Sequence, residues 1–464
     1  MFRIFEKAFI VVALIYFAAG LMLVLQPDDL PTSDEPPSNA SASVLVQQEK
    51  QSNSNDPTEK NKVKLAFQLG LYMITAALIT CNLREFMALI WKHKLLLLLL
   101  ALALVSATWS DEKAFTFRRS LVLIASTCFG VYLGSRYTMR EILRLVCIAG
   151  IIAAIASYLL IWRKPDLGIS SGVTEGDWQG IFSQKNTLGR FMALEVLFFF
   201  IGAIAEKKWR GLYIVGGLFC LPLLIMAKDA TALLSVPLLF ACLLLFQMAR
   251  RRSLVKMVAL ISAVSATAAG IVFLIIIEPR KLLLMMGKDT TFSGRTDIWA
   301  MVWQKFLDRP WFGYGYSAFW MGKDGKQSAD IWEALHWSVP HSHNGFLDVL
   351  VQVGVVGLAL FFVGYAVFFW KALRCARASK SILGLIPLMY LSFMLLFNFS
   401  EGSIIREESM FWVLYAALWV LTTRWLGLAE AAARQPAPSI APRARAVVPA
   451  GIPAWRFESS NSGL

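Results

Sequence analysis

The sequence predicts an all-α polytopic membrane protein with about twelve transmembrane helices. Three observations support this fold class. Of the 464 residues, 57% are hydrophobic and only 16% are charged, and many apolar runs are too long for the core of a soluble domain. Lys and Arg residues gather in every second loop between these runs. One large polar loop, residues 278–344, separates the ninth and tenth predicted spans.

The predicted spans are apolar runs of about 17 to 25 residues, the length that crosses a bilayer as a helix. They lie near residues 8–25, 65–82, 95–110, 119–134, 145–162, 188–205, 211–227, 230–248, 256–277, 345–370, 381–398 and 410–424. The first run is typical of either a signal peptide or an anchor. Because it lacks a small-x-small cleavage site, we expect an uncleaved anchor.

The spans and the segments between them define six regions. The linker is rich in Pro, Ser and Asn and the tail in Ala and Pro, so we expect both to be disordered. The regions are the anchor span 1–25, a periplasmic linker 26–64, spans two to nine in 65–277, a periplasmic loop 278–344, spans ten to twelve in 345–425, and a cytoplasmic tail 426–464.

The charges in the loops predict the orientation. The loops 83–94, 135–144, 206–210, 249–256 and 371–380 each hold three or four Lys or Arg residues. Positively charged loops stay on the cytoplasmic side, so we expect both termini in the cytoplasm and the polar loop on the outer side of the membrane. The net charge of +14 is dispersed over these clusters, which argues against a nucleic-acid partner. The six cysteines show no paired framework that would indicate disulfides or a zinc ribbon.

The polar loop contains a predicted amphipathic helix on the outer membrane surface. Ser293 is a candidate N-cap, apolar residues follow at helical spacing, and Pro310 ends the pattern. Arg295 lies in the first turn, where its guanidinium can bind a phosphate through two hydrogen bonds. An interfacial arginine that contacts bulk lipid explains the same position equally well.

Aromatic residues alternate with glycines directly after this helix, in "PWFGYGYSAFW". Aromatic faces suit sugar rings, so Trp311, Tyr314 and Tyr316 are candidates for contacts with a saccharide. An aromatic belt at the membrane interface is the commoner explanation of such a pattern.

Basic residues are also found where the topology predicts few of them, at the outer ends of spans. They are Arg118, Arg119, Lys185, Arg190, Lys228, Arg295 and Arg406. Ionisable residues at such positions usually face a cavity or a partner, so together they predict a site for an anionic substrate. Snorkelling at a helix end accounts for any one of them alone. Glu401, close to Arg406 in the chain, either forms an ion pair with it or orients a base, and we expect the local ion pair.

Two of the four histidines, His341 and His343, stand directly before a long apolar run. A histidine suits acid–base catalysis because its pKa lies near ambient pH. A zinc site is disfavoured, because His336 supplies a third ligand but no carboxylate at characteristic spacing completes the set. A histidine that caps the following helix is the plainer alternative.

These motifs resemble the O-antigen ligase and polymerase superfamily of bacterial envelope glycosyltransferases. The resemblance is carried by "GRTDIW" at 294–299, "RPWFGYGYSAF" at 309–319 and "HSHNGFLDVLVQVGVVGL" at 341–358, in this order and in a loop between two spans. In addition, "GIFSQKNTLG" at 180–189 is similar to a motif most typical of the exopolysaccharide polymerase branch. With the spans, the resemblance covers residues 65–425.

The resemblance implies transfer of a saccharide from undecaprenyl pyrophosphate to an acceptor hydroxyl at the periplasmic face of the inner membrane, with inversion and without a metal or another cofactor. It assigns Arg295 to the pyrophosphate and His343, the histidine before Asn344, to the acceptor. A further basic residue of the family corresponds to Lys228. There the chain departs from the usual Ser followed by Arg or Lys, because "AKDAT" places Asp229 beside the lysine.

Elementary chemistry agrees with these roles. Pyrophosphate is a good leaving group that needs cations, for which we expect Arg295, Lys228, Lys185 and Arg190. The acceptor hydroxyl needs a base, for which His343 is the first candidate and His341 the second. We expect Asn344, Glu401 and Arg406 to support the site.

Three functions remain open. The first is a polymerase of exopolysaccharide or O-antigen repeat units, and the second is a ligase that moves a finished glycan to lipid A core. The third is a transporter or flippase of the lipid-linked saccharide, which we disfavour because no repeated halves are found and the charges gather at outer ends. The expected partners are the lipid-linked saccharide, an acceptor glycan and the bilayer, with chain-length regulator or export proteins as candidates.

Overall fold

The computed structural model describes residues 2–20, 57–171, 175–250, 253, 295–321, 325–335 and 339–434. Within these ranges the chain forms helices joined by turns, with the isolated β-bridge Ile169–Trp178 as the only β-pairing. The all-α prediction is confirmed. The predicted span 256–277, the helix cap Ser293, His336 and most of the linker and the tail lie outside the described residues.

The bounds of the helices follow in chain order. They are α1 (Phe2–Ala19), α3 (Pro57–Thr80), α4 (Leu83–Ile90), α5 (Lys94–Val105), α6 (Lys113–Arg136), α7 (Met139–Arg163), α8 (Pro165–Gly168), α9 (Lys185–Ala205), α10 (Arg210–Met226), α11 (Ala230–Ala249), α14 (Arg295–Asp308), α15 (Lys326–Leu335), α16 (Gly345–Ala378), α17 (Ile386–Phe397) and α18 (Met410–Arg434). Both α3 and α18 therefore extend into segments that the sequence predicts to be disordered.

Eight of the described helices are long and apolar enough to cross a membrane, and nine if the bent pair Leu83–Ile90 and Lys94–Thr108 counts as one span. The two members of this pair meet at 88°. The predicted span 8–25 is helical in the part that belongs to α1, and the predicted span 381–398 is helical over Ile382–Phe397. Neither helix is among the eight. The described residues thus support a multi-pass membrane protein with fewer established spans than the predicted number.

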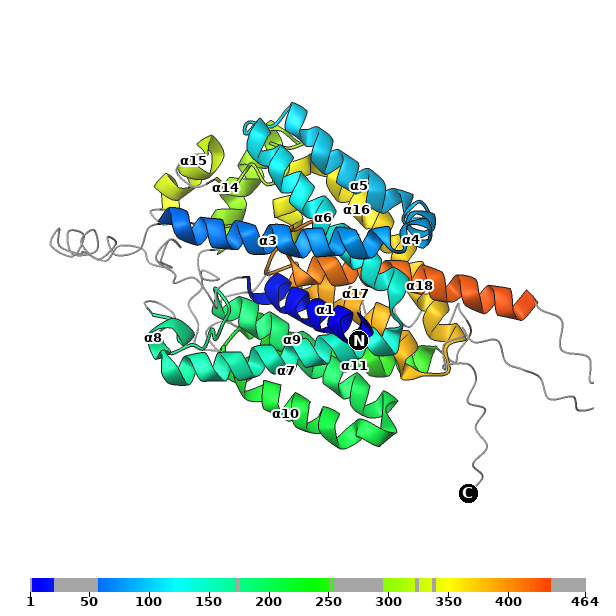
Figure 1. Ribbon diagram of the computed structural model, residues 1–464. Coiled ribbons are helices and arrows are strands. Elements are labelled where there is room, and N and C mark those ends of the chain that lie inside the picture. Colours follow the sequence, from blue (N-terminus) through cyan, green and yellow to red (C-terminus); the bar gives the residue numbers. More distant parts are fainter. Residues whose placement is uncertain are drawn as a thin grey trace, which may run out of the picture. The chain divides into compact units, whose positions relative to one another are not determined.

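The long helices of residues 1–426 lie side by side, and α8, α14 and α15 lie toward one end of them, on the left in Figure 1. We call this end the site end. At the site end, hydrogen bonds join loops and helix ends to one another. The Gly345 amide donates to the Asn398 carbonyl at 2.8 Å, the Tyr316 hydroxyl donates to the Ile405 carbonyl at 2.8 Å, and the Trp178 amide donates to a carbonyl of α10.

Small residues let α6 pack directly on the backbone of α18. A Cβ atom at Gly130 would lie 2.5 Å from the carbonyl oxygen of Val413, and one at Gly134 would lie 2.3 Å from that of Ala417. In lipid the hydrophobic effect does not drive helices together, so close van der Waals packing of this kind stabilises the contact between them. It fixes the first turns of α18 against the second half of α6.

A break in α16 anchors the aromatic stretch of the polar loop. Gly354 has a φ of 69° inside the helix, so the helical hydrogen-bond pattern is interrupted there. The freed carbonyls of Val351 and Gln352 accept from the amides of Tyr314 at 2.8 Å and Gly315 at 2.9 Å. The glycines of this stretch therefore serve a tight packing of loop against helix.

Candidate active site

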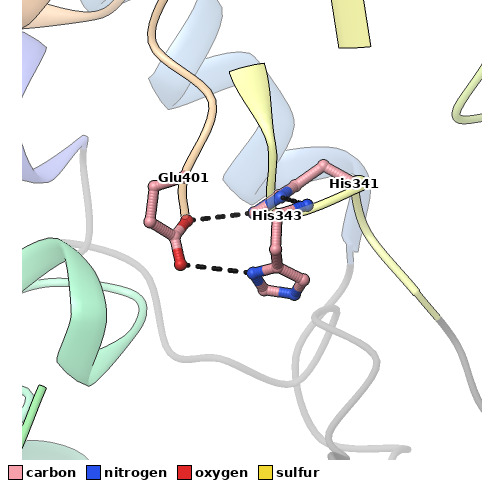
Figure 2. Close-up of side chains that lie close together, drawn as sticks. All are labelled: His341, His343 and Glu401. Atoms are coloured by element: carbon pink, nitrogen blue, oxygen red, sulfur yellow. Dashed lines mark hydrogen bonds and ion pairs between the residues drawn. The ribbon is translucent and has the colours of Figure 1, made fainter. Parts of the chain in front are cut away.

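The loop between α17 and α18 places the buried carboxylate of Glu401 at the centre of a polar cluster. Its Oε1 lies 3.2 Å from His343 Nδ1 and its Oε2 lies 3.6 Å from His341 Nε2. The Asn186 amide donates to Oε1 at 2.9 Å, and Arg295 Nη2 lies 3.7 Å from the same oxygen. Side chains from three other segments thus meet the Glu401 carboxylate, and Figure 2 shows both imidazoles facing it.

The loop that carries the histidines is held by the start of α16 and by two indoles. Asp348 Oδ1 accepts from the Ser342 amide at 3.1 Å and from Trp320 Nε1 at 2.9 Å. Trp299, on the helix that also carries Arg295, donates its Nε1 to the Ser342 carbonyl at 2.8 Å. These bonds fix the distance between the arginine helix and the histidines.

Asn344 caps α16, and neither histidine does. Its Oδ1 accepts from the amides of Phe346 at 3.0 Å and Leu347 at 3.2 Å, which satisfies two donors of the first turn. His343, directly before the cap, has a φ of 52°. A left-handed conformation of a residue other than glycine is uncommon and is concentrated at functional sites. The expected supporting role of Asn344 is therefore a structural one.

The hydrogen bonds define the proton positions in the neutral histidines. The His343 amide donates to His341 Nδ1 at 3.1 Å, so the proton of the His341 ring lies on Nε2, toward Glu401. An ionised carboxylate only accepts, so His343 donates from Nδ1 and keeps a lone pair on Nε2. This arrangement leaves His343 Nε2 able to accept a proton, and His341 supports the orientation of the His343 backbone.

The charge state of the cluster follows from burial and from its neighbours. Burial lowers the pKa of His341 well below its usual value, and His343 lowers it further, while Glu401 opposes this effect. Burial alone raises the pKa of Glu401, but the hydrogen bond from His343 and the positive charges around it hold this pKa well below its usual range. Glu401 is therefore the permanent anion of the site.

Arg190 lies buried beside this cluster and does not offer a free surface cation. Only 5% of the residue is exposed, and its guanidinium lies 4.4 Å from the centre of the Phe411 ring. Its Nε and Nη1 atoms have no hydrogen-bond partner among the described residues. Arg406 donates to the Gly402 carbonyl at 3.1 Å, and no ion pair joins it to Glu401 in the described structure. The expected pairing of Glu401 with Arg406 is wrong.

Lys185 and Lys228 contact a different carboxylate, that of Asp177. Lys185 Nζ lies 2.5 Å from Asp177 Oδ2, and Lys228 Nζ lies 2.9 Å from Oδ1. Next to Lys228, Asp229 caps α11 by accepting from the Thr231 amide at 3.0 Å. Burial and the charge of Glu401 raise the pKa of Asp229 to about 6. The two lysines therefore form a second polar cluster at the site end.

Two of the three aromatic candidates for sugar contacts lie inside the protein. Tyr314 and Tyr316 are buried, and their hydroxyls donate to the Lys305 carbonyl at 2.8 Å and to the Ile405 carbonyl and the Glu407 carboxylate. Their faces are covered by the protein, so they pack the loop. Trp311 is 66% exposed and keeps its face available.

Three side chains of the cluster have the composition of a metal site. Ligand atoms of His341, His343 and Glu401 all lie within 4.8 Å of one another, which is suitable for a zinc ion with a fourth open position. The same carboxylate also contacts the guanidinium of Arg295 and the amide donor of Asn186. The positive charge of Arg295 disfavours a divalent cation there, and the amide of Asn186 already occupies a lone pair of the carboxylate.

Sequence reasoning missed two residues of this site. Asn186 follows Lys185 directly, and its presence in "FSQKNTLG" was the available signal. Asp348 is a lone acid inside an apolar run, and such residues in membrane segments are usually functional or structural centres. Neither signal reveals which distant group is the partner.

The fold and this cluster define a multi-pass helical membrane protein whose loops assemble a carboxylate, two histidines and an arginine. Residues 215–362 match the family model described as O-antigen ligase, and this segment includes Arg295, His341 and His343. The exopolysaccharide production protein ExoQ of Rhizobium meliloti (strain 1021) is 27% identical over 189 residues, which cover 39% of this chain and 43% of that protein. The match thus spans less than half of the relative. Together the two matches confirm the resemblance to the O-antigen ligase and polymerase superfamily.

Proposed function

We propose that this protein is an inner-membrane glycosyltransferase that polymerises exopolysaccharide or O-antigen repeat units. The donor is a saccharide linked to undecaprenyl pyrophosphate, and the acceptor is a hydroxyl of a second glycan. The observation that carries the proposal is the oriented pair of Glu401 and His343 beside Arg295. It combines a base with a cation in the segment that matches the O-antigen ligase family model.

The distribution of charge supports a periplasmic site. Arg140 and Arg144 lie near the start of α7, at the end of the bundle opposite the site, where both pair with Glu206. The positive-inside rule assigns such clusters to the cytoplasm. The site end, and with it the transfer reaction, then faces the periplasm, and both termini are cytoplasmic.

The reaction is a single displacement with inversion. His343 Nε2 accepts the proton of the acceptor hydroxyl while the hydroxyl oxygen forms the new bond to the anomeric carbon. The bond from that carbon to the pyrophosphate oxygen breaks, and its electron pair leaves with the undecaprenyl pyrophosphate. Glu401 stabilises the imidazolium that forms, because the carboxylate is ionised and accepts from Nδ1. In this proposal no metal ion takes part in the transfer.

Arg295 stabilises the leaving group. Its contact to Glu401, at 3.7 Å, is longer than a hydrogen bond, and its side chain is 23% exposed, so most of its donors remain available to a phosphate. Two N–H donors in a planar fork match two phosphate oxygens. Charge that develops on the pyrophosphate is thereby stabilised next to the base.

Transfer of a finished glycan to lipid A core is the second candidate. It uses the same chemistry, and the description of the matching family model as O-antigen ligase favours it. The name of ExoQ, an exopolysaccharide production protein, favours the polymerase. A flippase would not require the oriented base.

The experiment is a glycan profile of a deletion strain that carries wild type, His343→Ala or Arg295→Ala at equal membrane levels. Loss of long polymer with accumulation of single lipid-linked units supports the polymerase. Full-length polymer that stays on its carrier supports the ligase. A normal profile with both variants would refute the catalytic assignment.

A further inference from the structure

The carboxylate of Asp177 forms ion pairs with Lys185 and Lys228, the two lysines that we assign to the pyrophosphate of the donor. Each of its oxygens takes one ammonium group, Lys185 at 2.5 Å and Lys228 at 2.9 Å. Only 6% of Asp177 is exposed. The donor pyrophosphate therefore approaches two lysines that are already paired with a carboxylate of the protein.

The backbone of Asp177 is fixed on both sides. Its carbonyl accepts from the Ser170 amide at 2.8 Å, and the amide of Trp178 donates to the Met226 carbonyl at 3.0 Å. Trp178 also pairs with Ile169 in the isolated β-bridge. The position of the Asp177 backbone is thus fixed, so a change of partner falls mainly to the longer lysine side chains.

The two lysines have the freedom for this movement. The Lys228 side chain is 56% exposed and the Lys185 side chain is 24% exposed, and each has four rotatable bonds. Lys185 begins α9, where Gln184 supplies no side-chain cap, so the positive end of the helix also faces this region. The next residue, Asn186, donates to Glu401 at 2.9 Å, which places the lysine cluster next to the reacting groups.

We propose that Asp177 is a built-in competitor of the donor pyrophosphate, which holds Lys185 and Lys228 until a more highly charged anion takes them over. This inference rests on the proposed function, since it takes a pyrophosphate as the ligand. One carboxylate carries a single negative charge, whereas a pyrophosphate carries at least two and more acceptor oxygens. The exchange therefore favours the donor over singly charged anions, and the lysines return to Asp177 when the leaving group departs.

The charge of Asp177 agrees with this role. Burial raises its pKa, but the hydrogen bonds from Lys185 and Lys228 outweigh burial and lower the pKa below its usual value. The carboxylate is consequently ionised near neutral pH. Protonation does not release the lysines near neutral pH, so release requires a competing anion.

The test measures binding of inorganic pyrophosphate to the purified full-length protein in detergent by titration calorimetry. Asp177→Asn keeps the shape but removes the charge, and we expect binding tighter by about threefold to tenfold, the range that one or two partly exposed ion pairs provide. Lys228→Gln should weaken binding. Asp166→Asn changes an exposed carboxylate shortly before Asp177 in the chain and should bind as wild type does.

Unchanged or weaker binding by Asp177→Asn would overturn the competitor role, and so would unchanged binding by Lys228→Gln. If Asp177→Asn fails to fold, the Lys228→Gln result still decides whether the lysine cluster binds pyrophosphate. The binding assay does not depend on glycan transfer. A normal glycan profile of His343→Ala with tighter binding by Asp177→Asn would therefore refute the proposed reaction and leave this inference standing.

Discussion

Two buried glutamates lie at opposite ends of the described bundle, and their partners differ in kind. Glu206, directly after α9, is 2.7 Å from Arg140 Nε and 2.7 Å from Arg144 Nη2. Glu401, before α18, contacts two histidines and an arginine at distances from 3.2 to 3.7 Å. Both carboxylates are buried, so burial alone does not distinguish a structural ion pair from a functional site.

The difference lies in what the partners can do. Arginine stays protonated at all physiological pH values, and its two short contacts with Glu206 tie α7 to the end of α9. Histidine exchanges its proton near neutral pH, and the longer contacts of Glu401 leave donors and a lone pair free. The two glutamates thus differ in the kind of partner: Glu206 contacts only arginines, whereas Glu401 also contacts residues of a type that exchanges protons.

Replacement of Glu401 should have the largest effect. Glu401→Gln keeps the side-chain size but removes the charge that orients His343 and stabilises its imidazolium. We expect the transfer rate to fall by about a hundredfold, within the range typical of general base catalysis. The measurement is polymer formation per molecule of membrane protein. A rate within twofold of wild type would contradict the role of Glu401.

Replacement of Arg295 by lysine tests the second contact of the site. Arg295→Lys keeps the charge and loses the planar fork, so we expect a loss of about tenfold. The matched control is Arg309→Lys near the other end of α14, where the arginine contacts Asp111 at 2.8 Å and lies away from the cluster. Equal losses in both variants would show that Arg295 has no special relation to the donor.

The pH profile gives a smaller but more specific signal. Burial lowers the pKa of His341, and Glu401 opposes this effect. In Glu401→Gln this opposition is lost and the pKa of His341 falls further, so an acidic limb of the rate profile that depends on His341 should move to lower pH. The measurement is the transfer rate of both proteins between pH 5 and 9. A limb at the same pH would indicate that another group limits the rate.

The sequence predicted the helices better than the contacts of the site. Apolar runs locate α3, α6 and α9 because length and hydropathy are local properties. The 88° bend before α5 was not predicted, because a short polar interruption near His93 does not indicate the angle between the helices on either side of it. Alternating aromatic residues do not distinguish an interfacial belt from a packed loop, so the burial of Tyr316 was not predicted.

The candidate site shows the same limit. Motif resemblance selected Arg295 and His343, whereas the partner of Glu401 was assigned to Arg406, a near neighbour in the chain. The contact from Glu401 to His343 spans 58 residues and that to Asn186 spans 215 residues. Such contacts depend on how the helix ends meet, which a single sequence does not encode locally.

The smallest effect on activity is expected at the other glutamate. Glu206→Gln removes the charge at the structural end and leaves the Glu401 cluster unchanged. Because both arginines are nearly half exposed, we expect a loss in the free energy of unfolding of about 1 kcal/mol or less. The polymer formed per folded molecule should equal that of wild type, while thermal denaturation in detergent should occur at a slightly lower temperature. The same kind of substitution thus removes most of the activity at one end and only a little stability at the other. A large loss of specific activity in Glu206→Gln would mean that the two ends are coupled, and that proton exchange by the partners is not what separates the two glutamates.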